Sequence, residues 1–149
     1  MASQYKLSLR MTHPSADLFD FSRMLDSSDV FMWKRGDLRL SPRGRVIGPG
    51  ERKEFFCSIT IDHNPGVELP ELIVTTLRRL EPHKETLDEL TTSGGSMDFF
   101  VGWFAEDYQS GETFDWTVLR GLADYRISLV FDVYGALDPE EEEAYAGTT

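Results

Sequence analysis

Residues 5–11 read Tyr-Lys-Leu-Ser-Leu-Arg-Met, with apolar side chains at every odd position and polar ones at every even position. A strict period of two is typical of a β-strand that buries one face. The same alternation recurs in residues 55–61, 97–103 and 127–133. We therefore expect four strands of one sheet, whose odd-numbered side chains face a common core.

The odd positions of these strands predict one buried layer that helices cover. Its expected members are Leu7, Leu9, Phe55, Cys57, Ile59, Phe99, Val101, Leu129 and Phe131 on strands, with Leu18, Leu77, Leu119 and Leu122 on helices. A fifth, shorter strand is expected at residues 31–33. Truncation of Phe131 to Ala is expected to cost about 3–5 kcal/mol if this layer forms.

The segments between the strands carry helical spacing. Ser15 is expected to cap a first helix, because apolar residues follow it at three- and four-residue intervals. A second helix is expected to open at Pro70 and to be interrupted at Pro82, since proline removes an amide donor. Its apolar stripe resumes and then stops at Gly94 and Gly95, a typical helix end.

Asp115 is expected to cap a third helix. Phe114 and Leu119 flank this position at the spacing of a hydrophobic staple, in which apolar side chains close the first turn. Leu122 and Ala123 would continue the buried face. Each expected strand beyond the first is thus preceded by a helix, except the third, which follows the second through a long loop.

The expected order β-α-β-β-α-β-α-β predicts an α+β fold. Its antiparallel-rich single sheet would be layered against helices, as a ferredoxin-like βαββαβ core with an additional αβ unit. A length of 149 residues suits one domain. We place that domain at residues 1–137 and expect the acidic segment 138–149, with four consecutive Glu, to be disordered.

Charge is distributed unevenly along the chain. Residues 31–53, FMWKRGDLRLSPRGRVIGPGERK, hold seven Lys and Arg against two acidic side chains, a net +5. Because the whole chain has a net charge of −11, the remaining residues carry −16. A basic loop in an acidic protein is expected to attract an anion or acidic partner, or to be neutralised by the protein's own carboxylates.

Composition also argues against several classes of function. A net charge of −11 repels nucleic acid and anionic lipid, so neither nucleic acid nor a membrane is an expected partner. No apolar run reaches the length of a membrane span, and residues 1–10 lack the apolar core of a signal peptide. The single Cys57 forms no internal disulfide and suits a cytoplasmic location.

Four short motifs carry a resemblance to a known family. They are Trp33-Lys34-Arg35-Gly36-Asp37, Leu-Glu-Pro-His at 80–83, Asp-Phe-Phe-Val-Gly-Trp-Phe at 98–104 and Leu-Val-Phe-Asp-Val-Tyr at 129–134. Over residues 5–135 the chain resembles a bacterial family catalogued as domain of unknown function 4279. The resemblance implies a small stand-alone α+β protein and carries over no activity. The chain departs from it at residues 40–53, which are longer and richer in arginine.

The even positions of the strands define a candidate ligand or partner face. Its expected members are Arg10, Asp98, Phe100, Phe104, Asp132 and Tyr134. A purely solvated sheet face would be polar throughout, whereas this one mixes aromatic and charged side chains, which suits a pocket or a protein contact. The alternative is that the hairpin around Trp33 covers this face and that Asp98 or Asp132 pairs with Arg10.

The basic loop is the second candidate site. Its residues of interest are Trp33, Lys34, Arg35, Asp37, Arg39, Arg43 and Arg45. Arginine suits bidentate contacts with carboxylate or phosphate, although the glycine spacing is not that of a phosphate-binding loop. We expect a largely buried Trp33 to anchor the loop and Arg39, Arg43 and Arg45 to be exposed.

No catalytic residue, metal site or cofactor is expected. His13, His63 and His83 are far apart, and no Cys and His spacing resembles a zinc site. Cys57 shares its strand face with apolar residues and is expected to be buried and unreactive. Asp98 and Asp132 would support acid–base chemistry only if close together, so an enzyme is disfavoured.

These observations favour a bacterial, cytoplasmic, non-catalytic module that binds another protein, as an inhibitor or immunity-type protein. The alternative is a protein or enzyme that binds a small molecule or anion through the even-numbered sheet face and the basic loop. A nucleotide or nucleic-acid binder is a weaker third hypothesis.

Overall fold

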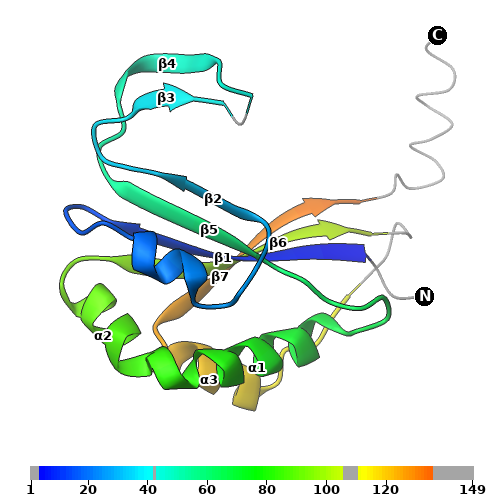
Figure 1. The fold of residues 1–149 in the computed structure, drawn as a ribbon. Coiled ribbons are helices and arrows are strands. Elements are labelled where there is room, and N and C mark those ends of the chain that lie inside the picture. The colour runs from blue at the N-terminus through cyan, green and yellow to red at the C-terminus, as the bar shows by residue number, and fades with distance from the viewer. Residues whose placement is uncertain (1–3, 42, 106–110, 136–149) are drawn as a thin grey trace, which may run out of the picture.

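The structure is a computed structural model that describes residues 4–41, 43–105 and 111–135. The expected domain boundary at residue 137 and the acidic segment 138–149 lie outside these ranges. Within them the chain forms a layer of helices against one large sheet, with a small second sheet on the opposite side (Figure 1).

The large sheet has five strands in the order β2-β5-β1-β6-β7. They are β1 (Gln4–His13), β2 (Val30–Trp33), β5 (Phe55–Ile61), β6 (Ser96–Phe104) and β7 (Ile127–Tyr134). The pairs β1–β5, β1–β6 and β2–β5 are antiparallel, and β6–β7 is parallel. The four expected strands and the short fifth one are confirmed, and so is the α+β class.

The helical elements lie on one face of this sheet (Figure 1). They are η1 (Phe19–Arg23), α1 (Leu69–Leu80), η2 (Glu81–His83), α2 (Lys84–Thr92) and α3 (Trp116–Asp124). The break that was expected at Pro82 is the 3-10 turn η2, which separates α1 from α2. Gly94 has φ of +113°, a conformation that favours glycine, and it follows the end of α2 as expected.

The first expected helix is reduced to the single 3-10 turn η1, and Ser15 does not cap it. Instead, the buried His13 organises the connection between β1 and η1. Its Nδ1 accepts hydrogen bonds from the backbone N–H groups of Ser15 (3.0 Å) and Ala16 (2.8 Å), and its Nε2 lies 2.9 Å from Ser93 Oγ. The ring therefore joins the end of β1 to the end of α2. The acceptor for backbone N–H groups in this segment is the His13 imidazole and not the Ser15 hydroxyl, which we expected to cap a helix.

Asp115 caps α3 as expected. Its Oδ1 accepts hydrogen bonds from the backbone N–H groups of Thr117 (2.9 Å) and Val118 (3.1 Å). These bonds, with one from the Thr117 hydroxyl, hold the pKa of Asp115 below its ordinary value. The hydrophobic staple was wrong, because Leu119 is 51% exposed while Phe114 lies edge-on against the Phe131 ring at 5.8 Å.

The core lies between the sheet and the helices. Most members of the expected layer are buried: Leu7, Leu9, Cys57, Ile59, Phe99, Val101, Leu18, Leu77 and Leu122. Phe55 and Leu129 are partly buried. Two expectations were wrong, because Leu119 and Phe131 are 51% and 41% exposed. Burial falls along β7 from Ile127 onward, and β7 is an edge strand with a neighbour on one side only.

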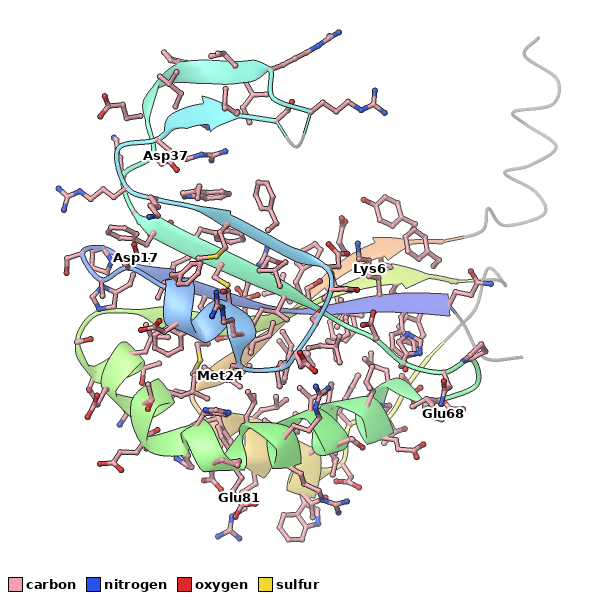
Figure 2. The ribbon with its side chains drawn as sticks, viewed as in Figure 1. Lys6, Asp17, Met24, Asp37, Glu68 and Glu81 are labelled. Atoms are coloured by element: carbon pink, nitrogen blue, oxygen red, sulfur yellow. The ribbon has the colours of Figure 1, made fainter. Side chains whose placement is uncertain are left out.

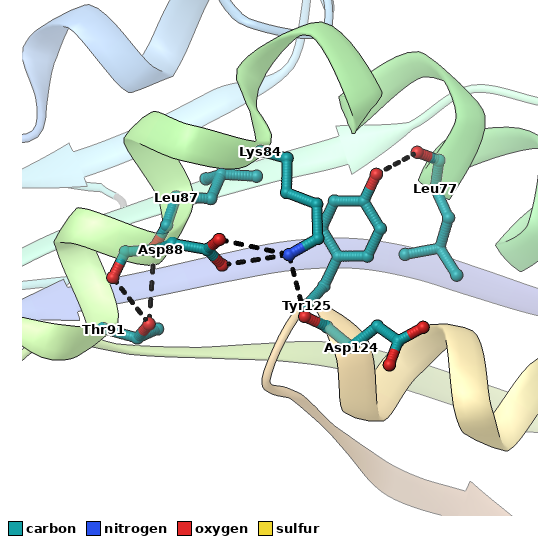
Figure 3. A network of polar contacts seen from close by, with 7 residues as sticks. All are labelled: Leu77, Lys84, Leu87, Asp88, Thr91, Asp124 and Tyr125. Carbon is teal, nitrogen blue, oxygen red and sulfur yellow. Dashed lines mark hydrogen bonds and ion pairs between the residues drawn. The ribbon is translucent and has the colours of Figure 1, made fainter.

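Polar contacts fix the three helices to one another (Figure 3). Lys84 Nζ reaches both carboxylate oxygens of Asp88 (3.2 and 3.1 Å) and donates to the Asp124 carbonyl (3.0 Å). The Tyr125 hydroxyl donates to the Leu77 carbonyl (3.2 Å), and burial raises the pKa of Tyr125. The helix layer is thereby tied together on one side of the sheet.

The basic segment was expected to be a loop, but it forms a second sheet. Strands β3 (Leu38–Leu40) and β4 (Val46–Glu51) pair as an antiparallel hairpin. We call residues 34–53 the arm. It rises from β2 and β5 on the sheet side opposite the helices, where Asp37 also lies (Figures 1 and 2). The base of the arm is closed by Gly36 N–H bonded to the Arg52 carbonyl (2.9 Å) and Arg52 N–H bonded to the Asp37 carbonyl (2.7 Å).

Within the described part of the chain, no helix has the length and apolar character that crossing a membrane requires.

Candidate functional site

The sheet face away from the helices holds a cleft of about 400 Å³. Even-numbered positions of four strands and both aromatic residues of β2 meet there. The cleft is lined by Lys6, Ser8, Arg10, Phe31, Trp33, Phe56, Ser58, Phe100, Gly102, Phe104, Asp132 and Tyr134. We call it the aromatic cleft. All six residues expected for the ligand face except Asp98 line it, and Asp98 pairs with the lining residue Arg10.

Small side chains form the floor of the aromatic cleft, because strand register places them in its centre. Ser8 of β1 lies opposite Phe100, Arg10 lies opposite Ser58, and Lys6 lies opposite Gly102. The absence of a side chain at Gly102 leaves space between Lys6 and the neighbouring Phe104 ring. The stacked aromatic rings therefore stand at the two sides of the face, and the cleft lies between them over β1 and β6.

One wall comes from β6 and β7. Phe104 and Tyr134 are register partners, and their rings stack with centroids 5.2 Å apart. Both are exposed, Tyr134 to 55%. The Tyr134 hydroxyl donates to Asp132 Oδ2 (2.7 Å), and this hydrogen bond to the carboxylate raises the pKa of Tyr134. Asp132 is thus already engaged by a neighbour on its own strand.

The opposite wall comes from β2 and β5. The Trp33 and Phe56 rings stack with centroids 4.1 Å apart, and Phe31 meets both of them edge-on. The Arg52 guanidinium carbon lies 3.7 Å from the Trp33 ring centroid. Trp33 is thus placed by contacts with β5 and with the base of the arm, but it is half-buried where we expected it to be largely buried.

An ion pair lies at the centre of the face. Arg10 Nε donates to Asp98 Oδ1 (2.7 Å), Arg10 Nη2 donates to Asp98 Oδ2 (3.0 Å), and the guanidinium lies 4.3 Å from the Phe100 ring centroid. This is the pairing that the alternative hypothesis expected. Asp132 lines the same cleft but contacts Tyr134 and does not pair with Arg10. Lys6 is exposed and lies on this side of the sheet (Figure 2), with its Nζ 3.9 Å from Asp29 Oδ2.

The cations of the arm are mostly without carboxylate partners among the described residues. Lys34 forms an ion pair with Asp17 (3.5 Å), and Arg35 Nη1 donates to the Pro14 carbonyl (3.3 Å). Arg43 and Arg45 are exposed as expected. Arg39 is half-buried instead, because its guanidinium packs against the backbone of Gly48 on the neighbouring strand. The acidic body therefore neutralises the arm through one described ion pair.

Several lining residues were not among the predicted site residues. They are Lys6, Ser8, Phe31, Phe56, Ser58 and Gly102 of the aromatic cleft, and Arg52 of the arm. The alternation in residues 55–61 does place Phe56 on this face, so an aromatic side chain at that position could have been predicted to line the site. Phe31 and Arg52 had no such signal, because their positions depend on how β2 and the arm are arranged in space.

In the described ranges no three His, Cys, Asp or Glu side chains gather into a group that would hold a metal ion. Cys57 is fully buried on the helix side of β5, and burial raises the pKa of its thiol to about 11. Cys57 is therefore buried, as the sequence predicts, and a raised pKa disfavours the reactive thiolate.

We expect Cys57 to make the fold sensitive to alkali. The unfolded chain loses this thiol proton near pH 9, whereas the folded chain keeps it to about pH 11. The unfolded state is therefore favoured progressively between these values, by about 2–3 kcal/mol for a shift of this size. Urea unfolding from pH 8 to 11 should show this decline, and a Cys57→Ala variant should lack that part of it. Equal pH dependence of both proteins would contradict the prediction.

Comparison with protein families gives a match that spans nearly all of the described chain. The model of the family described as Domain of unknown function (DUF4279) matches residues 3–136, which include every strand of the large sheet and both walls of the aromatic cleft. Comparisons with curated proteins and with solved structures each gave no match. The chain therefore belongs to the family of domain of unknown function 4279, as its motifs indicated.

Proposed function

We propose that this protein is a non-catalytic module that binds another protein, in the manner of an inhibitor or immunity protein, through the aromatic cleft. One observation carries the proposal: Phe31, Phe104 and Tyr134 are exposed around a single hollow on the sheet face that the helices leave uncovered. Aromatic side chains in and around a pocket are the usual centre of a protein interface.

The charges of the cleft support binding over catalysis. Asp98 is held by Arg10 in a bidentate pair, and Asp132 accepts the Tyr134 hydroxyl. Both carboxylates thus hold neighbouring side chains of the face in place. The apolar area is what the face offers to a partner, since exposed apolar patches commonly mark interaction sites.

Site-specific photo-crosslinking tests the proposal. A benzophenone amino acid at position 104 should link the protein to a partner polypeptide in the cells that produce it. The same group at position 116 is the matched control, because Trp116 is a 70% exposed aromatic residue on α3, away from the cleft. The linked partner, identified by mass and then purified, should bind a Tyr134→Ala variant at least tenfold more weakly and a Trp116→Ala variant normally.

Two outcomes would count against this function. Linking at position 116 as efficient as at position 104 would mean that the cleft is not the preferred contact surface. Normal affinity of the Tyr134→Ala and Phe104→Ala variants for the purified partner would mean that the aromatic wall contributes nothing to binding.

A small-molecule binder is the second candidate, because the cleft volume of about 400 Å³ lies in the range of ligand pockets. Its aromatic walls would suit a flat apolar group, and Lys6 would suit an anionic substituent. Native mass spectrometry of the protein purified from its source cells separates the two candidates. A bound small mass, lost in a Phe104→Ala variant, would favour the ligand, and its absence together with crosslinking would favour the protein partner.

Two further inferences concern the fold and the setting. The antiparallel order β6-β1-β5-β2 supports a ferredoxin-like core to which α3 and β7 add the extra αβ unit, although its first helix is shortened to η1. An experimental structure would test that topology. The setting we propose is the bacterial cytoplasm, which the lone, buried Cys57 supports. Fractionation of source cells would test it.

A further inference from the structure

Two buried donor atoms near the base of the arm have no hydrogen-bond partner in the described structure. They are the indole Nε1 of Trp33 and the Nε of Arg52. An unpaired buried donor destabilises a fold, so two of them on contacting side chains need an explanation. Both groups are donors only, since neither an indole nor a guanidinium accepts hydrogen bonds. What they lack is an acceptor.

The two side chains are held in contact by their surroundings. The Arg52 guanidinium lies on one face of the Trp33 indole and the Phe56 ring lies on the other, with separations of 3.7 and 4.1 Å. The backbone of Arg52 is bonded to Gly36 and Asp37 across the base of the arm. The guanidinium itself has one long hydrogen bond, from Nη2 to the Leu40 carbonyl (3.4 Å). Its hydrogen-bonding capacity is mostly unused.

A second cavity adjoins these donors. It has a volume of about 390 Å³ and lies between β2 and the arm, next to the aromatic cleft. We call it the arm pocket. Its lining residues include Trp33, Arg52, Leu38, Leu40 and Asp37. Leu38 and Leu40 of β3 are apolar but exposed, because nothing in the described structure covers them. The Asp37 carboxylate accepts a hydrogen bond from the Lys34 backbone N–H (2.8 Å), and this bond holds the carboxylate against the backbone of the arm.

We infer that the arm pocket binds a carboxylate of the partner protein, with a neighbouring apolar side chain of the partner on Leu38 and Leu40. The inference rests on the proposed function and names the chemistry that the partner presents. A guanidinium matches a carboxylate in a planar, bidentate geometry, and the two unpaired donors supply hydrogen bonds to its oxygens. Both donor atoms are closed off from solvent, so binding as inferred requires the Arg52 guanidinium to shift on the indole face when the carboxylate enters.

Charge distribution favours an acidic segment over a basic or neutral one. The arm and its flanking residues, 31–53, carry a net +5 in a chain of net −11. Lys34 is the one arm cation with an ion pair in the described structure. An acidic segment is therefore attracted to the arm and repelled by the rest of the molecule, which orients it toward the arm pocket.

Titration followed by nitrogen–proton NMR tests the inference with a minimal probe. N-acetyl-leucine carries a carboxylate next to an apolar side chain, and N-acetyl-leucinamide is its neutral counterpart. The acid should shift the indole N–H signal of Trp33 in a saturable manner at millimolar concentrations, and the amide should not. The signal is assigned with a Trp33→Phe variant, and the indole of the exposed Trp116 serves as an internal reference that stays unmoved.

Variants separate a specific site from general positive charge. Arg52→Gln should weaken the acid's binding by about tenfold, the loss expected for a charge-assisted hydrogen bond. The matched control is the double variant Arg43→Gln, Arg45→Gln, which removes more charge from exposed positions of the same arm and should change affinity less than twofold at physiological salt. Inorganic phosphate is titrated in parallel to distinguish a carboxylate site from a general anion site.

Each adverse outcome overturns the inference in a recognisable way. Equal shifts with acid and amide would show that the carboxylate is not recognised, and no Trp33 shift with the acid would show that the arm pocket does not bind it. Stronger binding of phosphate would assign the pocket to a different anion. If Arg52→Gln fails to fold, the acid-to-amide comparison on the unaltered protein still decides. Crosslinking at position 104 is independent of all these readouts, so failure of the proposed function is seen separately.

Discussion

Replacement of Phe99 by Ala should lower the free energy of unfolding by about 3–5 kcal/mol, the usual cost of removing a large core aromatic. Phe99 is fully buried on β6, with Leu9 of β1 and Leu129 of β7 as its register partners. The side chain therefore lies where three strands contribute to one layer. Equilibrium urea unfolding, followed by circular dichroism, measures the loss.

Phe131→Ala is the matched control, because the same substitution is made on the neighbouring strand. Phe131 is 41% exposed, so its truncation should cost on the order of 1 kcal/mol. The alternation in residues 97–103 and 127–133 gives the two phenylalanines the same expected role, and the structure separates them. Equal losses in the two variants would place the second half of β7 in the core and would contradict this description of the sheet.

Gly95→Ala should be the second strongly destabilising change, by about 3 kcal/mol, near the upper end of typical overpacking costs. A Cβ at this position would lie 2.7 Å from the Leu90 carbonyl oxygen and 2.8 Å from the Thr12 carbonyl oxygen. Both are backbone atoms, of α2 and β1, so neither moves away as a flexible side chain would. The Gly95 N–H also bonds to the Leu90 carbonyl (2.8 Å), which fixes the approach.

Gly102→Ala is the control for this second prediction. A Cβ at Gly102 would meet ordinary contacts, 3.7 Å from the Phe104 ring and 4.0 Å from Lys6 Cβ. Its melting temperature should therefore stay close to that of the unaltered protein, whereas that of Gly95→Ala should fall by many degrees. A Gly95→Ala protein as stable as the Gly102→Ala protein would show that α2 and β1 are not as closely packed as described.

The strands were predictable from sequence because one face of each is buried and the other is not. A period of two is then imposed by the core, and it identified β1, β5, β6 and β7 directly. The same logic misplaced Phe131, since alternation reports which face a side chain occupies and not whether anything covers that face. Leu119 failed for a related reason: helical spacing placed it near the apolar stripe, but α3 turns it to solvent.

The site was predictable only in part. Alternation placed Phe100, Phe104 and Tyr134 on the correct face, because that face follows from the core. The opposite wall depends on β2, which has four residues, too few to show a periodic pattern of apolar side chains. The arm was missed as a hairpin because glycine and proline interrupt β4, and its pairing with β3 creates no buried face that would impose a pattern.

The central place of β1 has a consequence for biosynthesis. This strand is made first, yet both of its neighbours come much later, and Gln4 pairs with Phe104. A nascent chain that has left the ribosome only as far as α2 holds β1 with one open edge, because β6 has not yet been made. Since such long-range pairings form slowly, this is the stage at which the growing chain is most exposed to aggregation or chaperone binding. Synthesis of β6 closes that edge.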